Sequence, residues 1–170
     1  MKKKNAEIVI IEDEEDILEL LEYHFTKEGY DVTGFLSAEN VEQFMEEESP
    51  SLLIVDRNLP GIEGSEFIAY MREIGYDTPV IFLTAKDRDD DLEEGFKRGC
   101  DDYITKPFKI KEVLLRAEAL LRRSGVNQSD RVRYRDLILD NKTRELLIDD
   151  KKIDLTKLEY KLLHTFVKNA

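Results

Sequence analysis

The sequence lacks paired cysteines and long apolar runs. Its 170 residues contain one cysteine, Cys100, so an internal disulfide framework is excluded. No apolar run approaches the roughly 18 residues of a membrane-spanning helix, and the run after the basic amino terminus is too short for a signal peptide. No histidine lies near Cys100, which favours a packing role over a nucleophilic one. These absences predict a cytoplasmic globular protein with no membrane partner.

Positive charge is scarce in the first part of the chain. Residues 1–123 hold 16 Lys/Arg and 30 Asp/Glu, a net charge of −14, whereas residues 124–170 hold 10 and 8, a net charge of +2. Because phosphate backbones repel an acidic domain, the first part is a poor nucleic-acid binder by itself. A carboxylate cluster within it could still concentrate divalent cations.

Apolar strands and amphipathic helices alternate along residues 7–123. Short apolar runs without internal alternation are typical of strands buried on both faces in a parallel sheet. We expect strands at 7–11, 30–35, 52–56, 80–83 and 101–105, and helices at 14–28, 37–47, 64–74, 87–98 and 109–123. Ser37 is the expected cap of the second helix. Five such alternations predict an α/β fold, with a five-stranded parallel doubly wound sheet and helices on both faces.

The chain changes character after residue 123. Residues 124–131 are polar and turn-rich, which is typical of a linker. Short strands are expected at 133–140, 145–148 and 152–155, followed by a helix at 157–169 that opens on the capping box Thr156-Lys157-Leu158-Glu159. Leu158, Leu162, Leu163 and Phe166 are predicted to face inward. About 47 residues make a poor independent core, so 132–170 are predicted to be a small, incomplete α+β segment.

Three predicted strands end in oxygen-bearing side chains. Glu12 and Asp13 follow the first strand, Asp56 ends the third, and Thr84 follows the fourth. Ligands bind at the carboxyl edge of open α/β sheets, so we expect these side chains to lie together there. Three crowded carboxylates are costly without a cation, and oxygen ligands favour Mg²⁺ above all. Taken alone, each acid could equally be a surface residue that starts a loop.

Lys106 adds a cation at the end of the fifth strand. It could lie beside Asp56, and Thr84 could donate a hydroxyl hydrogen bond. A carboxylate, a metal site, a hydroxyl and a lysine together make a phosphoryl site, with Asp56 as the nucleophile. A cis peptide bond at Lys106-Pro107 would aim the lysine, although cis is only about 5% of X–Pro bonds.

Together these motifs resemble the two-component response regulators of the OmpR/PhoB family. The resemblance rests on Glu12-Asp13, Asp56 with Leu59-Pro60-Gly61, Gly64, Thr84-Ala85, Gly99-Cys100-Asp101-Asp102-Tyr103 and Lys106-Pro107-Phe108. It implies a flavodoxin-like receiver domain at 1–123 with strand order 2-1-3-4-5 and a linker at 124–131. Residues 132–170 resemble the amino-terminal part of a winged-helix DNA-binding domain, without its recognition helix and wing.

The resemblance implies a role for each acidic residue. Asp56 would accept a phosphoryl group from the phosphohistidine of a sensor histidine kinase. Asp13 and Asp56, with the backbone carbonyl of Asn58, would hold Mg²⁺, and Glu12 would act through water. No enzymatic activity is implied beyond phosphotransfer to the protein's own Asp56 and slow autodephosphorylation.

The resemblance also implies a switch and a homodimer. Thr84 and Lys106 would bind the phosphoryl oxygens, and Tyr103 would be the switch aromatic; a packed aromatic on an edge strand is the alternative for Tyr103. Phosphorylated receivers of this kind pair through the fourth helix, fifth strand and fifth helix. Here that face would offer Asp101, Asp102, Glu112, Arg116 and Arg122. Leu92 departs from the family's basic residue, which leaves Glu112 without its expected cross-dimer partner.

Two other classes of function are compatible with parts of this sequence. A Mg²⁺-dependent phosphatase would need a second aspartate two residues after Asp56, and that position holds Asn58. A stand-alone receiver that acts through protein–protein interaction is disfavoured by the linker and the capping-box helix, but it stays open for the 170-residue chain. We expect a longer parent protein to bind promoter DNA, and this chain to bind DNA weakly and without sequence preference.

Overall fold

The computed structural model describes residues 6–85, 99–124, 131–140, 144–149 and 151–169. The chain divides into two units, residues 1–125 and 126–170, and each is described by itself. The helix expected at 87–98, which includes Leu92, lies outside the described residues, as does most of the expected linker.

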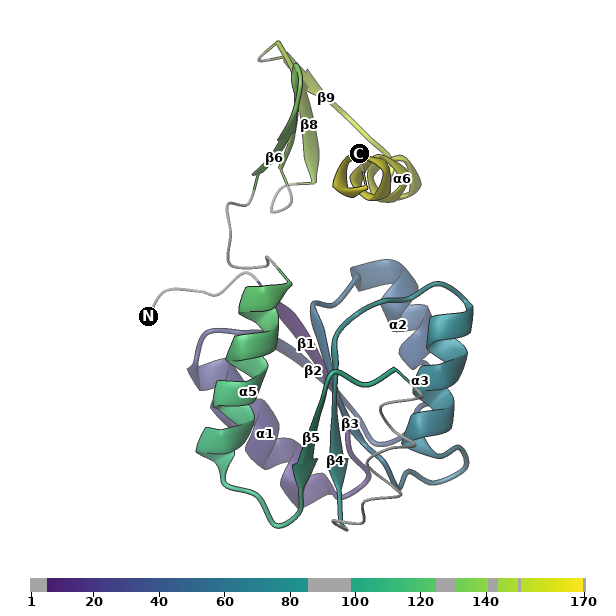
Figure 1. Ribbon diagram of the computed structural model, residues 1–170, viewed down its shortest axis with the longest axis vertical. Helices are drawn as coiled ribbons and strands as arrows, with labels where there is room; N and C mark the ends of the chain where they lie inside the picture. Colours follow the sequence, from purple (N-terminus) through teal and green to yellow (C-terminus); the bar gives the residue numbers. More distant parts are fainter. Residues whose placement is uncertain (1–5, 86–98, 125–130, 141–143, 150, 170) are drawn as a thin grey trace. The chain divides into compact units, whose positions relative to one another are not determined.

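Five parallel strands form the sheet of the first unit, in the order β2-β1-β3-β4-β5 (Figure 1). They are β1 (Glu7–Ile11), β2 (Asp31–Phe35), β3 (Leu52–Asp56), β4 (Val80–Thr84) and β5 (Asp102–Thr105). Every residue of β3 and β4 is buried, because a parallel sheet needs cover on both faces. The predicted doubly wound α/β fold and its strand order are confirmed.

Helices cover both faces of this sheet (Figure 1). The helices α1 (Glu15–Lys27) and α5 (Ile110–Arg123) lie on one face, and α2 (Val41–Glu48) and α3 (Gly64–Glu73) lie on the other. Each helix buries an apolar stripe; in α1 the stripe is Leu18, Leu21 and Phe25. Each fully buried side chain of this kind contributes about 1.5–3 kcal/mol. These two layers hold the strand ends in fixed positions.

The helix α2 begins later than predicted. Asn40 stands at its N-cap position, with a φ of 65°. Ser37 lies one turn earlier, where its Oγ accepts a hydrogen bond of 3.3 Å from the Glu39 backbone N–H. The prediction that Ser37 caps α2 is therefore wrong, because a serine hydroxyl can close a local turn as readily as a helix.

A four-stranded antiparallel sheet in the order β6-β7-β8-β9 and one described helix form the second unit. The elements are β6 (Arg131–Tyr134), β7 (Leu137–Asp140), β8 (Glu145–Ile148), β9 (Lys151–Ile153) and α6 (Lys157–Lys168). The single strand expected at 133–140 is wrong. Arg135, with a φ of 53°, turns the chain so that Tyr134 pairs with Leu137. Such turns usually carry Asn-Gly or Asp-Gly, and Arg-Asp gives no comparable signal.

The predicted capping box of α6 is confirmed. The Oγ1 of Thr156 accepts a hydrogen bond of 3.2 Å from the Glu159 N–H, and the Thr156 N–H donates to Glu159 Oε2 at 2.9 Å. These reciprocal bonds satisfy backbone N–H groups that the first turn of a helix leaves without partners. The start of α6 is therefore specified locally by its own sequence.

The inward face of α6 differs from the prediction. Leu158, Leu162 and Phe166 are 68%, 65% and 63% exposed, so the prediction that they face inward is wrong. Val167 is 9% exposed and Leu163 is half-buried, so the buried side of the helix is rotated away from Leu158, Leu162 and Phe166. The helix has two apolar faces, and periodicity alone cannot say which one packs on a sheet.

The packing of the second unit can be tested with two leucines, one buried and one exposed. Leu146→Ala removes a side chain that is 6% exposed, and we expect a loss of about 2–5 kcal/mol in stability. Leu162→Ala should change stability by no more than about 0.5 kcal/mol. Hydrogen exchange of the β7 and β8 amides measures both losses. Equal losses for the two variants would contradict the orientation of α6.

Candidate functional site

The carboxyl edge of the parallel sheet gathers the predicted site residues. The strand register aligns the ends of β1 and β3, of β3 and β4, and of β4 and β5. Glu12 and Asp13 follow β1, Asp56 ends β3, Thr84 ends β4, and Lys106 follows β5. Five chemically active side chains therefore lie at one edge because three buried strands and one edge strand end there.

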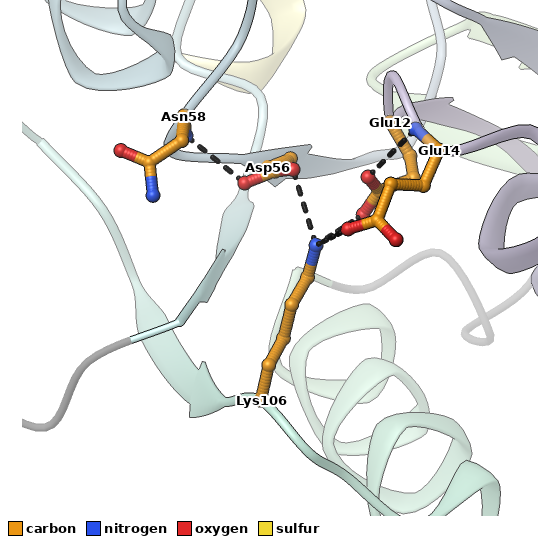
Figure 2. A network of polar contacts seen from close by, with 5 residues as sticks. All are labelled: Glu12, Glu14, Asp56, Asn58 and Lys106. Atoms are coloured by element: carbon orange, nitrogen blue, oxygen red, sulfur yellow. Dashed lines mark hydrogen bonds and ion pairs between the residues drawn. The ribbon is translucent and has the colours of Figure 1, made fainter.

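Lys106 joins two carboxylates in this pocket (Figure 2). Its Nζ lies 2.8 Å from Glu12 Oε2 and 3.1 Å from Asp56 Oδ2. A third carboxylate oxygen, Oε1 of the exposed Glu14, lies 3.7 Å away. Glu12 is fully buried and Asp56 is 4% exposed. Charge-assisted hydrogen bonds are strong where water is largely excluded, so the ammonium group holds the ends of β1 and β3 together. The Lys106-Pro107 peptide bond is cis.

Burial perturbs the ionisation of this cluster. Burial raises the pKa of Glu12 from 4.5 to about 7; Lys106 acts to lower it and Asp56 acts to raise it. Burial lowers the pKa of Lys106, but the hydrogen bonds and charges of Glu12 and Asp56 outweigh it, so the Lys106 pKa is raised overall. The raised pKa of Glu12 therefore reflects mainly the removal of its carboxyl from water, with a smaller contribution from the neighbouring carboxylate of Asp56.

The donor atoms fit a small divalent cation. Glu12, Asp13 and Asp56 each place a carboxylate oxygen within 4.8 Å of the others, and Asp13 is exposed to solvent. The Asn58 N–H donates a hydrogen bond of 2.9 Å to Asp56 Oδ1, which fixes the start of the loop after β3 (Figure 2). These donors are oxygens and include no nitrogen or sulfur, as Mg²⁺ prefers.

Thr84, a predicted phosphoryl-binding residue, and Tyr103, the predicted switch aromatic, are both buried. Thr84 is 3% exposed at the end of β4, on the same edge as Asp56. Tyr103 lies in the middle of β5, and its ring centroid is 5.8 Å from that of Phe82 at an interplanar angle of 48°. Tyr103 belongs to the core cluster on this strand. The aromatic ring is thus packed inward in this structure.

Three residues of the predicted dimer face form one cluster on β5 and α5. Arg116 Nη1 lies 2.7 Å from Asp102 Oδ1, and Arg116 Nη2 lies 3.2 Å from Glu112 Oε1. Arg122 is exposed in the last turn of α5. Asp102, Glu112 and Arg116 are thus already paired with one another within one chain.

Asp101, the remaining residue of that predicted face, is engaged elsewhere. Its Oδ2 accepts a hydrogen bond of 2.8 Å from the Val80 N–H and lies 3.5 Å from Arg72 Nη2. Arg72 also donates to the Gly99 carbonyl at 2.9 Å. The carboxylate of Asp101 therefore anchors the start of β5 to β4 and α3. The preceding Cys100 is buried, and burial above all raises the pKa of its thiol to about 12, which suits a packing role.

Sequence reasoning missed two charged residues beside the site. Arg57 follows Asp56 directly, its side chain is 7% exposed, and its Nε lies 3.0 Å from Oε1 of Glu63. The available signal was a cation directly after an apolar strand, with an acid six residues later. The turn residues Pro60 and Gly61 separate the two, so no helix or strand periodicity could link them.

Comparisons with known proteins agree with this geometry. Residues 8–118 match the response regulator receiver domain. The chain is 38% identical over 169 residues to the uncharacterized transcriptional regulatory protein YkoG of Bacillus subtilis, covering 98% of this chain and 74% of YkoG. It is 35% identical to the transcriptional regulatory protein SrrA of Staphylococcus aureus, covering 92% of this chain and 68% of SrrA. The response regulator DrrB of Thermotoga maritima, an OmpR/PhoB homolog, superposes with a TM-score of 0.62 at 30% identity, over 97% of this chain and 73% of DrrB.

The family match identifies residues 8–118 as a receiver domain, which is built on a five-stranded parallel sheet with an acidic edge. The chain belongs to the response regulators of two-component systems, and its relatives include transcriptional regulators. The resemblance to the OmpR/PhoB family is supported by the DrrB structure. Among the described helices, none has the length and hydropathy that crossing a bilayer requires.

The raised pKa of Glu12 predicts how pH affects the metal-free protein. Between pH 4.5 and 7 the folded protein binds more protons at Glu12 than the unfolded chain does. The stabilising contribution of Glu12 is therefore complete below pH 4.5 and is lost as the pH rises to about 7. Glu12→Gln should remove this decline and raise the free energy of unfolding above pH 7. Urea unfolding with a chelator present measures it.

The exposed neighbour Glu15 supplies the control for this experiment. Glu15→Gln removes the same charge from the same end of the chain, and it should keep the pH dependence of the wild type. A decline that persists unchanged in Glu12→Gln would show that the buried carboxyl is not its source.

Proposed function

We propose that this protein is a phosphorylation-controlled regulator whose Asp56 accepts a phosphoryl group from the phosphohistidine of a sensor histidine kinase. The observation that carries the proposal is the 3.1 Å contact between Lys106 Nζ and Asp56 Oδ2 inside a pocket of three carboxylates. A nucleophilic carboxylate beside a fixed cation is what phosphoryl transfer requires of a protein. A Mg²⁺-dependent phosphatase would need an aspartate at position 58, and the asparagine found there disfavours that function.

In this mechanism each Asp56 oxygen already has a defined partner. Oδ1 accepts the Asn58 N–H and Oδ2 accepts Lys106 Nζ, so the carboxylate is oriented before the donor arrives. An Asp56 oxygen forms a bond to phosphorus while the bond from phosphorus to the imidazole nitrogen breaks. The imidazole nitrogen leaves with the electron pair. Asp56 then carries the phosphoryl group as an acyl phosphate.

Mg²⁺ would be held by Asp13, Asp56 and the Asn58 carbonyl, with Glu12 acting through water. When bound, it would offset the negative charge of the carboxylates and the incoming phosphoryl oxygens. A cation in the pocket favours the ionised form of Glu12, which opposes the effect of burial on its pKa. The buried carboxyl therefore becomes a better partner for Lys106 in the loaded site.

Phosphorylation changes what Lys106 and Thr84 bind. Lys106 would move its contact from the Asp56 carboxylate to a phosphoryl oxygen, and the Thr84 hydroxyl would donate to another. Thr84 and Lys106 flank the end of β5, so both changes act on the strand that carries Tyr103. We infer that this biases the surface of Asp102, Glu112, Arg116 and Arg122 toward a homodimer, with Arg116 exchanging its intramolecular pairs for pairs across the interface.

The second unit is proposed to be the beginning of a winged-helix output domain that controls transcription, in a cytoplasmic protein. Support comes from the relatives named as transcriptional regulators and from the match to DrrB, which extends beyond the receiver domain. A stand-alone receiver that acts through protein contacts is the second candidate. The presence of the capped helix α6 after the receiver disfavours it, whereas the large exposed side chains Leu158, Leu162 and Phe166 of that helix suit contact with protein better than contact with a phosphate backbone.

Phosphorylation should occur on Asp56 and require Mg²⁺. We expect acetyl phosphate with Mg²⁺ to label the wild type, and borohydride reduction followed by mass spectrometry to map the acyl phosphate to Asp56. Asp56→Asn should abolish the label, because an amide cannot form the acyl phosphate. Asp31→Asn, at an exposed carboxylate on β2, is the matched control and should be labelled normally. Label that persists in Asp56→Asn would reject the assignment.

Lys106 should couple phosphorylation to dimerisation. We expect Lys106→Ala to accept some phosphoryl group, since Asp56 is still present, but to stay monomeric in sedimentation experiments after phosphorylation. Lys109→Ala, an exposed lysine at the start of α5, should dimerise like the wild type. Normal phosphorylation-dependent dimerisation of Lys106→Ala would remove this lysine from the switch.

A further inference from the structure

The loop between β3 and α3 is closed tightly at its base. The carbonyl oxygen of Arg57 accepts a hydrogen bond of 2.8 Å from the Gly64 N–H, which joins the two ends of the loop. A Cβ atom at Gly64 would lie 2.3 Å from the Asp56 carbonyl oxygen, a distance that allows no side chain. The backbone of the loop therefore passes directly against the end of β3.

A second link spans the same base. The Nε of Arg57 lies 3.0 Å from Oε1 of Glu63, the residue just before α3 begins. The Arg57 side chain is 7% exposed, whereas that of Glu63 is 39% exposed. The guanidinium stays charged at any relevant pH, and a buried charge is stable only beside a compensating group. The ion pair thus holds the first and last residues of the 57–63 loop together.

Asn58 lies between two anchored residues of this loop. Arg57 precedes it, and Leu59, which is buried in the core, follows it. Its own N–H donates to Asp56 Oδ1. The Asn58 side chain is exposed, so its backbone is the part of the residue that the fold holds firmly. The direction of the Asn58 carbonyl depends on these anchors.

We propose that the ion pair between Arg57 and Glu63 is a positioning device that orients the Asn58 carbonyl and so sets the affinity of the site for Mg²⁺. This inference rests on the proposed function, in which that carbonyl is a ligand. Mg²⁺ demands near-ideal octahedral geometry, so a small rotation of one ligand is costly. Outer groups that orient metal ligands typically change metal affinity by about 10-fold or more. Arg57 and Glu63 would be positioning residues, because neither is among the proposed ligands of the ion.

Glu63→Ala is the variant that tests this, because Glu63 is partly exposed and its truncation leaves the core intact. We expect the dissociation constant for Mg²⁺, measured by calorimetry with the purified full chain, to rise about 10-fold. Hydrogen exchange of the Asn58 and Leu59 amides in the metal-free protein should speed up. Glu63→Gln keeps an acceptor for Arg57 without the charge, and it should fall between the wild type and Glu63→Ala.

Glu66→Ala is the matched control, since it removes the same charge three residues further along, in the first turn of α3. It should change the dissociation constant by less than about twofold. Equal affinities for Glu63→Ala and Glu66→Ala would overturn the inference while leaving the proposed Mg²⁺ site in place. A wild-type protein without saturable Mg²⁺ binding would overturn the proposed function and this inference with it.

Discussion

The contacts of the Lys106 ammonium with Glu12 and Asp56 are the interaction on which the site depends. They join residues that are 94 and 50 positions apart in the chain. Without this cation, the ends of β1 and β3 would bring buried carboxylates together with no compensating charge, which costs several kcal/mol per ion. The strand order puts β1 next to β3 and β3 next to β4, so the repulsion is built into the topology. Lys106 offsets part of it, while burial above all, and Asp56 to a smaller extent, keep the pKa of Glu12 raised.

The buried carboxyl of Glu12 links the stability of the protein to its proposed function. Glu12 is fully buried, and burial is the main cause of its raised pKa, so its ionisation costs stability in the metal-free protein. The buried carboxyl is explained if the pocket is matched to a cation and a phosphoryl group. The same principle applies to Arg57 and Glu63, a charged pair beside a strand of five buried residues. In the proposed site, both features would position oxygen atoms for the cation and the phosphoryl group.

Much of the first unit could be predicted because its signals are local. Apolar runs located the strands, and the acids that follow β1 and end β3 must lie at one edge because the strands are parallel. The contacts of Lys106 needed the strand order as well, which the family resemblance supplied. Predictions failed where two solutions have similar energies. Ser37 can close a local turn or cap a helix, and α6 has two apolar faces. Arg135 adopts a positive φ, which an arginine in the sequence does not predict. The pairing of Arg57 with Glu63 depends on how the 57–63 loop folds, which no periodicity encodes.

The central claim is that the acidic edge is one cation site, rather than part of a generally acidic surface. Paramagnetic broadening of amide resonances by Mn²⁺, a stand-in for Mg²⁺, tests it most directly. We expect saturable broadening centred on residues 12, 13 and 56–58, reversed by excess Mg²⁺, with little effect at the acidic end of α2, where Glu46, Glu47 and Glu48 follow one another. Broadening spread over the carboxylates of α1 and α2 without saturation would contradict the account.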